Sequence, residues 1–175
     1  MTMIDCLRFT AISSVLLGTA ALAAPVTYKI DSGHTYPSFE ADHAGGLSIW
    51  RGKFNSTAGT IVLDREAKTG SLDVTIDAAS IDFGHDKMNE HAKSPDMFDV
   101  AKYPTVKYTG KLTNFKNDAP TTVEGSLTLH GVTKPVTLTI DRFKCTINQR
   151  TGKQACGANA VGKFNRDDFR VGYGK

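Results

Sequence analysis

The feature of this sequence that most restricts its fold is a strict alternation of apolar and polar residues. Leu72, Val74 and Ile76 alternate with serine, aspartate and threonine, so one side of the segment is apolar and the other polar. This period of two is typical of a β-strand with one buried face and one face in water. The pattern recurs at Val106, Tyr108, Gly110 and Leu112, at Val123, Gly125, Leu127 and Leu129, and at Val136, Leu138 and Ile140.

Turn-forming residues separate these segments, and the spacing predicts more strands on either side of them. The additional strands are expected at residues 27–31, 36–43, 49–54, 57–63 and 157–164. After Ile140 the apolar positions change parity, with Phe143 the next of them. This change predicts a β-bulge near Asp141 and Arg142 that bends the strand.

Residues 85–94 depart from the β pattern. Met88 and Ala92 lie four residues apart, which places them on one face of a short helix. Eight or so strands in sequential order, with one crossing helix, predict an all-β chain. The expected architecture is an up-and-down antiparallel β-barrel or a closely related sandwich.

Residues 1–23 have the pattern of a secretory signal peptide, which leaves residues 24–175 as a single domain. Arg8 precedes an uncharged run that ends in Ala21, Leu22 and Ala23, with small residues at the two positions that a signal peptidase reads. The apolar run is shorter than the roughly 20 residues that span a bilayer, so no stable membrane insertion is expected. The mature protein is therefore expected to be secreted.

Removal of the signal peptide also removes Cys6 and leaves Cys145 and Cys156. An even number of cysteines in an oxidising compartment favours a disulfide between them. The segment between them is polar and contains Gly152, so both cysteines can lie on facing strands of one hairpin. A zinc site is the weaker alternative, because there is no CxxC motif and no histidine at ligand spacing.

Composition places the chain among ordinary globular domains. It is 40% hydrophobic and 22% charged with a formal net charge of +3, which argues against a disordered charged tail. Its basic residues are interleaved with acidic and apolar ones rather than grouped. No nucleic-acid interface is therefore expected.

The sequence lacks the common catalytic motifs, among them GxSxG, HExxH, the Walker loop and GxGxxG. His85 and His91 are six residues apart, so on a helix they face different directions and are expected to be exposed rather than paired at a metal. His43 shares strand parity with Phe39 and Ala41. It is expected to be either a polar group inside an apolar lumen or a core histidine bonded to a backbone carbonyl.

Several inward positions carry small residues, and these bear on whether the barrel interior is open. They are Ala41, Gly52, Gly110 and Gly125. Small residues leave volume for a slender ligand in an eight-stranded barrel, but glycines also mark bulges and bends. On the residues alone, a cavity and a packed core both remain open.

Long stretches of the sequence match the motifs of one family. Residues 126–138 read SLTLHGVTKPVTL, residues 91–105 read HAKSPDMFDVAKYPT, and residues 50–54 read WRGKF. With the opening stretch from Tyr28 to His34, and with His43 and Gly45, these segments resemble the YceI-like polyisoprenoid-binding protein family. The resemblance covers nearly all of the mature chain.

The resemblance implies a bacterial periplasmic protein with an extended, lipocalin-like antiparallel barrel. Its lumen would hold a long isoprenoid chain, such as the tail of a quinone or polyprenyl lipid, for carriage rather than catalysis, and it would need no cofactor besides that lipid. Met97, Phe98 and Tyr103 are expected to close one end. The ligand-binding candidates, chosen by position, are Phe39, Ala41, His43, Trp50, Phe54, Val74, Ile76, Met97, Phe98, Val106, Tyr108, Leu127, Leu129 and Leu138.

The sequence departs from the family pattern near its C-terminus. The segment from Asp168 to Gly174 is normally followed by another apolar strand, whereas this sequence ends at Lys175. Without that strand, an open seam is expected beside the first and last strands. Either the sequence is truncated, or another chain, as in a homodimer, supplies the closing strand.

Two other functions stay open at this point. One is a small secreted metal-dependent enzyme that uses His43 or the pair His85 and His91. The other is a stress-protective module without a ligand.

Overall fold

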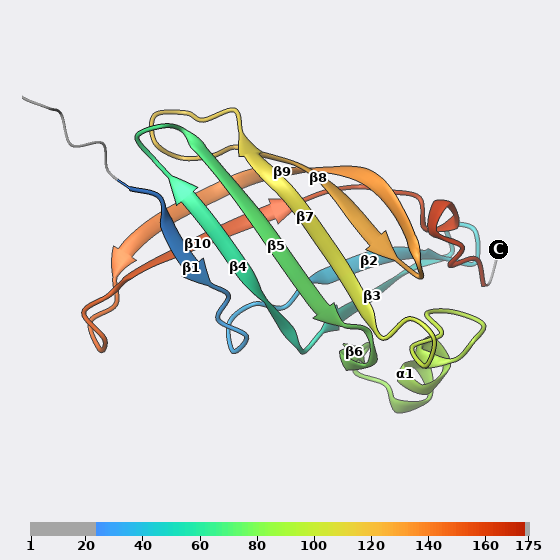
Figure 1. Cartoon of the computed structure of the whole chain (residues 1–175). Helices are drawn as coiled ribbons and strands as arrows, with labels where there is room; N and C mark the ends of the chain where they lie inside the picture. The colour runs from blue at the N-terminus through green and yellow to red at the C-terminus, as the bar shows by residue number, and fades with distance from the viewer. Residues whose placement is uncertain (1–23, 174–175) are drawn as a thin grey trace, which may run out of the picture.

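Most of the chain forms one long, curved antiparallel sheet. The computed structural model describes residues 24–173. In spatial order the large sheet contains β1 (Val26–Lys29), β4 (Thr57–Asp64), β5 (Thr69–Asp77), β7 (Thr105–Thr113), β8 (Thr122–Leu129), β9 (Val132–Ile147) and β10 (Gln154–Val161). The sheet curls until β10 comes to lie beside β1, so that it is a nearly closed barrel (Figure 1). This arrangement confirms the antiparallel barrel predicted from the alternation.

A second, smaller sheet stands apart from the barrel. It contains β2 (Ser38–His43), β3 (Ser48–Phe54) and the short β6 (Ile81–Asp82). Two of the predicted barrel strands, at residues 36–43 and 49–54, therefore pair with each other and not with the barrel, and the prediction of one sequential meander is wrong for them. The chain leaves the barrel at a turn in which Asp31 accepts hydrogen bonds from the backbone N–H groups of Gly33 and His34.

The bulge predicted in the long ninth strand is present. Asn159 pairs with Arg142, and the next residue, Ala160, pairs with Ile140. Asp141 is therefore skipped in the strand pairing with β10. The side-chain amide of Asn159 donates to both carboxylate oxygens of Asp141, at 2.8 and 2.9 Å. The extra residue accounts for the change of parity seen in the sequence, and a bulge of this kind bends the strand.

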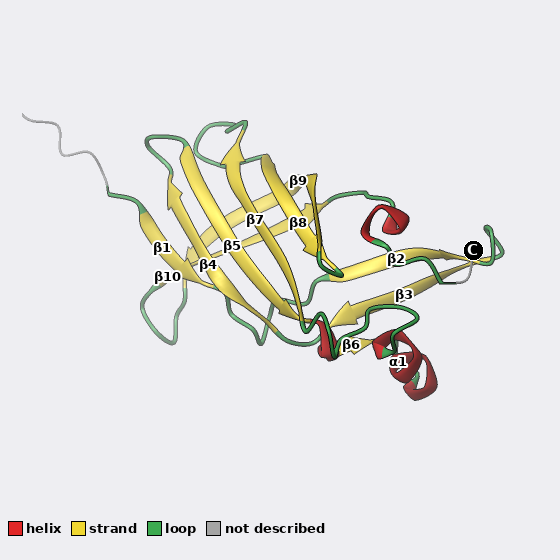
Figure 2. Cartoon of the chain, turned by 45° about the vertical axis from the view of Figure 1, so that its right-hand side comes forward, coloured by secondary structure: helices red, strands yellow, loops and turns green. Residues whose placement is uncertain are grey.

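The predicted helix is confirmed as α1 (Asp86–Lys93). His85 caps its N-terminus by accepting a hydrogen bond from the backbone N–H of Met88, at 3.3 Å. Ala92 is fully buried, which fixes the helix against the end of the barrel. Two short 3₁₀ helices, η1 (Ala78–Ser80) and η2 (Arg166–Phe169), lie at the same end as α1 and the small sheet (Figure 2).

The carboxylate of Asp82 connects the small sheet to α1. It accepts hydrogen bonds from the backbone N–H of Gly84 and from the side-chain amides of Asn55 and Asn89. These bonds, the one from Gly84 above all, lower the pKa of Asp82 because they stabilise its charged form. The base of the β2–β3 hairpin is thus fixed, while its tip extends beyond the barrel (Figure 2).

The two ends of the large sheet meet at a seam without backbone pairing. Within the described residues, β1 and β10 each have a neighbour on one side only. The seam is bridged by the Tyr28 hydroxyl, which donates a hydrogen bond to the side-chain carbonyl of Gln154. The open seam predicted beside the first and last strands lies at this place.

None of the helices within residues 24–173 combines the length and the apolar character that crossing a membrane requires. The signal peptide predicted for residues 1–23 lies outside the described residues.

Candidate functional site

Some apolar side chains face the interior of the barrel without being fully covered. Tyr28, Ile61 and Leu72 lie directly opposite one another on β1, β4 and β5 and so form a row across three strands. Together with three further residues they make up what we call the inner wall. It consists of Tyr28, Ile61, Leu72, Val74, Leu138 and Phe143, each partly buried and packed against the core. This wall has no charged side chain, so it offers an apolar surface on the concave side of the sheet.

Sequence reasoning placed only Val74 and Leu138 of this wall among the ligand-binding candidates. Leu72 was part of the predicted alternation, and Tyr28 stood in the family motif. The row depends on the register of β1 with β4 and of β4 with β5. The alternation shows which face of each strand is apolar, but it does not specify this register.

Five other candidates belong to the packed core of the large sheet. Leu127, Leu129, Val106, Ile76 and Tyr108 are each at most 8% exposed. The hydroxyl of Tyr108 donates to the backbone carbonyl of Val136 at 2.7 Å. Burial of this ring raises the pKa of Tyr108 to about 12.

The inward glycines do not leave open space. A Cβ atom at Gly125 would lie 2.5 Å from the Tyr108 hydroxyl oxygen, and one at Gly110 would lie 2.7 Å from a methyl carbon of Val123. At Gly52 the same atom would lie 2.6 Å from the ring of Phe39. Of the two alternatives that the sequence left open, these three glycines fit the packed core, because a neighbouring side chain occupies the space beside each of them.

The end of the barrel next to α1 is closed by apolar side chains. Phe54 and Met97 are buried there, at 7% and 8% exposure. Phe98 packs edge-on against Phe54 with ring centroids 6.0 Å apart. Tyr103 lies beside His130, at a centroid distance of 4.3 Å. Met97, Phe98 and Tyr103 all lie between α1 and β7, and their role in closing this end against a ligand stays a prediction.

The remaining candidates lie on one face of the β2–β3 hairpin. Phe39, Ala41 and Trp50 are partly buried on this face. His43 shares the face, as its parity predicted, but it lies near the hairpin tip and is exposed to solvent. Neither the interior position nor the core position expected for His43 is therefore correct, because the hairpin extends past the barrel.

The other histidines do not converge on a common point. His85 caps α1, whereas His91 is partly buried and its ring lies 4.4 Å from that of Tyr173. The expectation of an exposed side chain is thus correct for His85 and wrong for His91. Within residues 24–173 no group of three or more His, Cys, Asp or Glu side chains is arranged to hold a metal ion.

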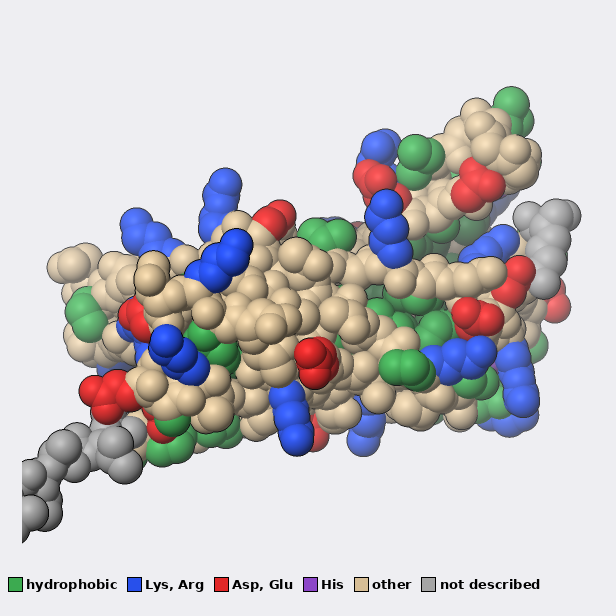
Figure 3. Space-filling model, turned by 90° about the horizontal axis from the view of Figure 1, so that it is seen from above, with side chains coloured by type: hydrophobic (Ala, Val, Ile, Leu, Met, Phe, Trp, Pro, Cys, Tyr) green, Lys and Arg blue, Asp and Glu red, His purple; other side chains and the backbone are tan. Residues whose placement is uncertain are grey.

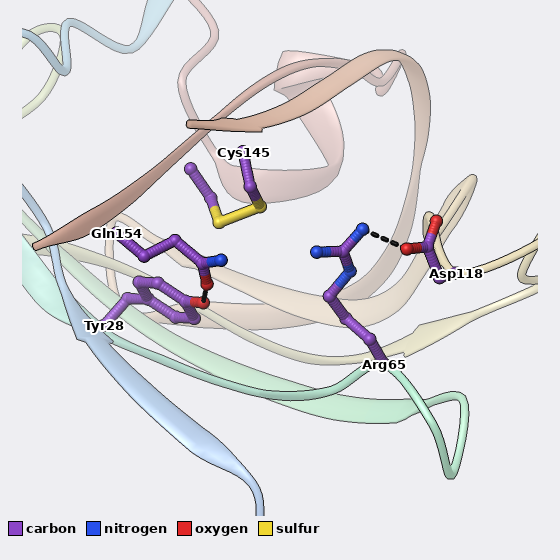
Figure 4. The surroundings of a disulfide bond; sticks show 6 residues. Tyr28, Arg65, Asp118, Cys145 and Gln154 are labelled. Atoms are coloured by element: carbon purple, nitrogen blue, oxygen red, sulfur yellow. Dashed lines mark hydrogen bonds and ion pairs between the residues drawn. A yellow bond between two sulfur atoms is a disulfide. The ribbon is translucent and has the colours of Figure 1, made fainter. Parts of the chain in front are cut away.

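Polar and covalent links gather at the other end of the barrel (Figure 4). Cys145 and Cys156 are direct partners on β9 and β10 and form the predicted disulfide. Near it, Arg65 in the turn after β4 forms an ion pair with Asp118 in the loop between β7 and β8. With the bridge from Tyr28 to Gln154, these links hold the loops at this end together.

Charged side chains are spread over the outside of the molecule. Lysine and arginine side chains are interspersed with aspartate and glutamate side chains on the face seen from above (Figure 3). That face has no continuous basic patch of the kind that binds nucleic acid.

Comparison with known proteins identifies the family. Residues 28–175 match the family model described as a YceI-like domain. Protein YceI of Escherichia coli O6:H1 is 34% identical over 160 residues, covering 89% of this chain and 82% of that protein. A UPF0312 protein of Pseudomonas putida (strain W619) is 32% identical over 170 residues, covering 91% and 85% of the two chains.

The solved structures agree with the sequence relatives. The crystal structure of the Campylobacter jejuni YCEI protein superposes with a TM-score of 0.62 at 28% identity, covering 82% of this chain and 84% of that one. The family model, the sequence relatives and the solved structure lead to the same assignment, and this chain belongs to the YceI-like domain family.

Proposed function

We propose that this protein is a periplasmic carrier that binds a long-chain isoprenoid lipid, of the polyprenyl or isoprenoid quinone type, on the inner wall of its barrel. The observation that carries the proposal is the inner wall itself. Its six side chains face the concave side of the sheet, are apolar, and are only partly buried. Apolar surface in contact with water is unfavourable, and surfaces of this kind commonly mark binding sites. The inner wall therefore favours an apolar ligand.

The shape of the wall fits a slender chain. Tyr28, Ile61 and Leu72 form their row across three adjacent strands, and neighbouring strands lie about 4.8 Å apart. An isoprenoid tail is narrow and has no hydrogen-bonding groups, so it can lie along the row without leaving polar atoms unpaired. Each Å² of apolar surface that it buries contributes about 25 cal/mol.

Binding, rather than catalysis, is the function that this surface supports. The inner wall contains a single polar atom, the Tyr28 hydroxyl, and that atom is already hydrogen-bonded to Gln154. Nucleophilic catalysis would require a nucleophile and a base within hydrogen-bonding distance of each other. The alternative of a metal-dependent enzyme has no supporting group of ligands within the described residues.

The periplasmic location is part of the proposal. It is supported by the signal-peptide pattern of residues 1–23 and by the pairing of Cys145 with Cys156, since disulfides persist in oxidising compartments. Intact-mass measurement of protein from the periplasmic fraction of a bacterial host should show a chain that starts at residue 24. A chain that retains the leader in the cytoplasm would contradict this part.

The ligand can be identified by extraction. Protein purified without detergent should release a prenyl lipid into organic solvent, in an amount close to one lipid per chain, as measured by mass spectrometry. Leu72→Asn should lower the lipid content, because it places an amide on the inner wall. Asp73→Asn, on the outer face of the same strand, should leave the content unchanged. An empty extract, together with no binding of an added prenol or quinone, would overturn the proposal.

A further inference from the structure

We propose that the tip of the β2–β3 hairpin docks this protein reversibly on the surface of a lipid bilayer, where the side chains of Leu47 and Ile49 enter the outer edge of the apolar layer. The inference rests on the proposed function, because a prenyl lipid is dissolved in a bilayer and its carrier has to touch that bilayer to take it up. The hairpin tip consists of residues 43–49, which are the turn between β2 and β3 and the residues next to it.

The hairpin tip carries two strongly exposed aliphatic side chains. Leu47 is 81% exposed and Ile49 is 56% exposed, the two highest values among the large hydrophobic side chains of the described residues. Single exposed apolar residues are common on proteins. These two lie two positions apart at the projecting end of a hairpin that extends beyond the barrel (Figure 2). They therefore form one small apolar surface that is presented away from the rest of the molecule.

The hairpin holds this surface in a defined shape. The backbone N–H of Leu47 donates to the carbonyl of His43 at 3.1 Å and closes the turn. The Nδ1 atom of His43 lies 3.0 Å from the hydroxyl oxygen of Ser48, across the hairpin. At the base, the carboxylate of Asp82 fixes the hairpin to α1 through its bonds to Asn55 and Asn89. A partner of the tip therefore does not have to order a flexible loop, which lowers the cost of binding.

The composition of the tip fits a bilayer better than a groove on another protein. None of residues 43–49 is acidic, a lysine or an arginine, so no charge has to leave water when the tip is covered. Protein interfaces are anchored mainly by tryptophan, tyrosine and arginine, whereas leucine is under-represented among such anchors. At Gly45 and Gly46 no atom of the described chain lies within 4 Å of the place of a Cβ atom, so the turn stands clear of the molecule there. A bilayer accepts such a projecting turn without a matching shape.

Charged side chains begin directly behind the tip and limit how deep it can enter. Asp42 is exposed and is the direct strand partner of Ile49. The next pair on this face joins Glu40 and Arg51, where the arginine Nε donates to the carboxylate at 2.8 Å. This pair lies two residues farther from the tip, about 7 Å along the strands. Only the tip itself therefore enters the apolar layer, which agrees with the roughly 5–10 Å that interfacial segments penetrate.

The rings near the tip suit the headgroup layer. Trp50 follows Ile49 in the sequence but points to the other face of the hairpin, where its ring lies edge-on to His43 at a centroid distance of 5.6 Å. Amphipathic rings such as indole are enriched at the boundary between a membrane and water. Along the hairpin, aliphatic side chains are thus followed by rings and then by charged side chains. This is the order of layers that a bilayer surface offers.

Vesicle binding tests the proposal. The full-length mature protein is mixed with vesicles of phosphatidylcholine, with and without phosphatidylglycerol, and the bound fraction is measured by co-sedimentation. Trp50 is the only tryptophan of the chain, so its emission should shift to shorter wavelength on binding as water leaves the indole. We expect binding to persist in about 0.5 M salt, where the Debye length is only about 4 Å, because entry of aliphatic side chains does not depend on charge.

Four variants locate the contact. Leu47→Ser should weaken binding to vesicles about tenfold and Ile49→Ser about fivefold, because each removes an aliphatic side chain from the apolar layer. Ile147→Ser is the matched control and should bind as the native protein does. Ile147 is 51% exposed at the end of β9, and the turn after it lies at the opposite end of the molecule (Figure 1). Asp42→Asn should strengthen binding to vesicles with phosphatidylglycerol about threefold, since it removes an anion next to a negative surface.

The outcomes separate this proposal from the carrier function. All four substituted side chains are exposed, so urea denaturation should show unchanged folding. Equal vesicle binding by Leu47→Ser and Ile147→Ser, binding that vanishes in salt, or no vesicle binding by the native protein would each overturn docking through the tip. Carriage is judged by organic extraction, so a prenyl lipid in the extract would leave it standing in all these cases. Vesicle binding by a protein that takes up no prenyl lipid would overturn carriage and leave the docking surface standing.

Discussion

In two regions of this protein an aromatic ring covers a glycine on the paired strand, but the two rings are buried to different extents. In the barrel, the ring of Tyr108 covers Gly125 on the neighbouring strand, and in the hairpin the ring of Phe39 covers Gly52. Pairing an aromatic ring with a glycine in this way stabilises a strand that has no side chain at that position. Yet Tyr108 is 8% exposed, whereas Phe39 and its neighbour Trp50 are only partly buried.

The difference comes from what surrounds each pair of strands. β7 and β8 lie in the middle of a seven-stranded sheet that curves around their inner side chains. β3 has only β2 on one side and the two-residue β6 on the other, where Lys53 and Phe54 make the two pairs. Alternation therefore determines which face of a strand is apolar, and the number of flanking strands determines whether that face becomes core or accessible surface.

The largest expected effect comes from truncating one ring in each region. Tyr108→Ala should lower the free energy of unfolding by about 3–4 kcal/mol, because it leaves a cavity over Gly125 and removes the hydrogen bond to Val136. Trp50→Ala should cost only about 1–2 kcal/mol, since less of its surface is removed from water. Urea denaturation of both variants without lipid measures the two changes. An equal or larger loss in Trp50→Ala would show that the hairpin is part of the folding core.

Replacing glycine with alanine tests how tightly each region is packed, because it adds a methyl group where the previous variants remove a ring. A methyl group at Gly125 would lie 2.5 Å from the backbone oxygen of Thr109 as well as from the Tyr108 hydroxyl. Gly125→Ala should therefore destabilise the protein by about 1–3 kcal/mol through overpacking. Gly157→Ala, on the edge strand β10, meets nothing within 4 Å and should change the free energy of unfolding by about 0.5 kcal/mol or less. Thermal unfolding of the two variants would separate them, and similar melting temperatures would contradict the filled interior.

The contrast also explains how far the sequence predicted this structure. The alternation found the four central strands of the large sheet, and the parity change after Ile140 located the bulge at Asp141. Turn spacing added the strands at residues 27–31 and 57–63, and it placed the last strand at 157–164, whereas β10 spans Gln154–Val161. The spacing of Cys145 and Cys156 predicted their pairing because both cysteines and their turn belong to one local hairpin. Such features depend on neighbours in the sequence, so the sequence carries them.

The features that were missed depend on partners far away in the chain. Residues 36–43 and 49–54 alternate as barrel strands do, and nothing local shows that β1 pairs with β4 and leaves them outside. His43 was misplaced for the same reason. The sequence left open whether the glycines mark a cavity or a packed core, because the rings that cover them, such as Tyr108 over Gly125, lie on another strand. For the candidate site, parity gave the facing direction of Val74 and Leu138, whereas the row of Tyr28, Ile61 and Leu72 needed the register.

The smallest expected effect concerns the proton of Tyr108. Its pKa is about 12 in the folded protein against an ordinary value of 10, because burial disfavours the phenolate. The stabilisation is complete below pH 10 and is lost as the pH rises toward 12, since the unfolded chain gives up this proton first. The free energy of unfolding should thus fall over this range by about 1–2 kcal/mol more in the native protein than in Tyr108→Phe. Urea denaturation at intervals from pH 9 upward measures the difference, and parallel curves for the two proteins would show that water reaches the hydroxyl and that the barrel is less filled here than the glycine contacts indicate.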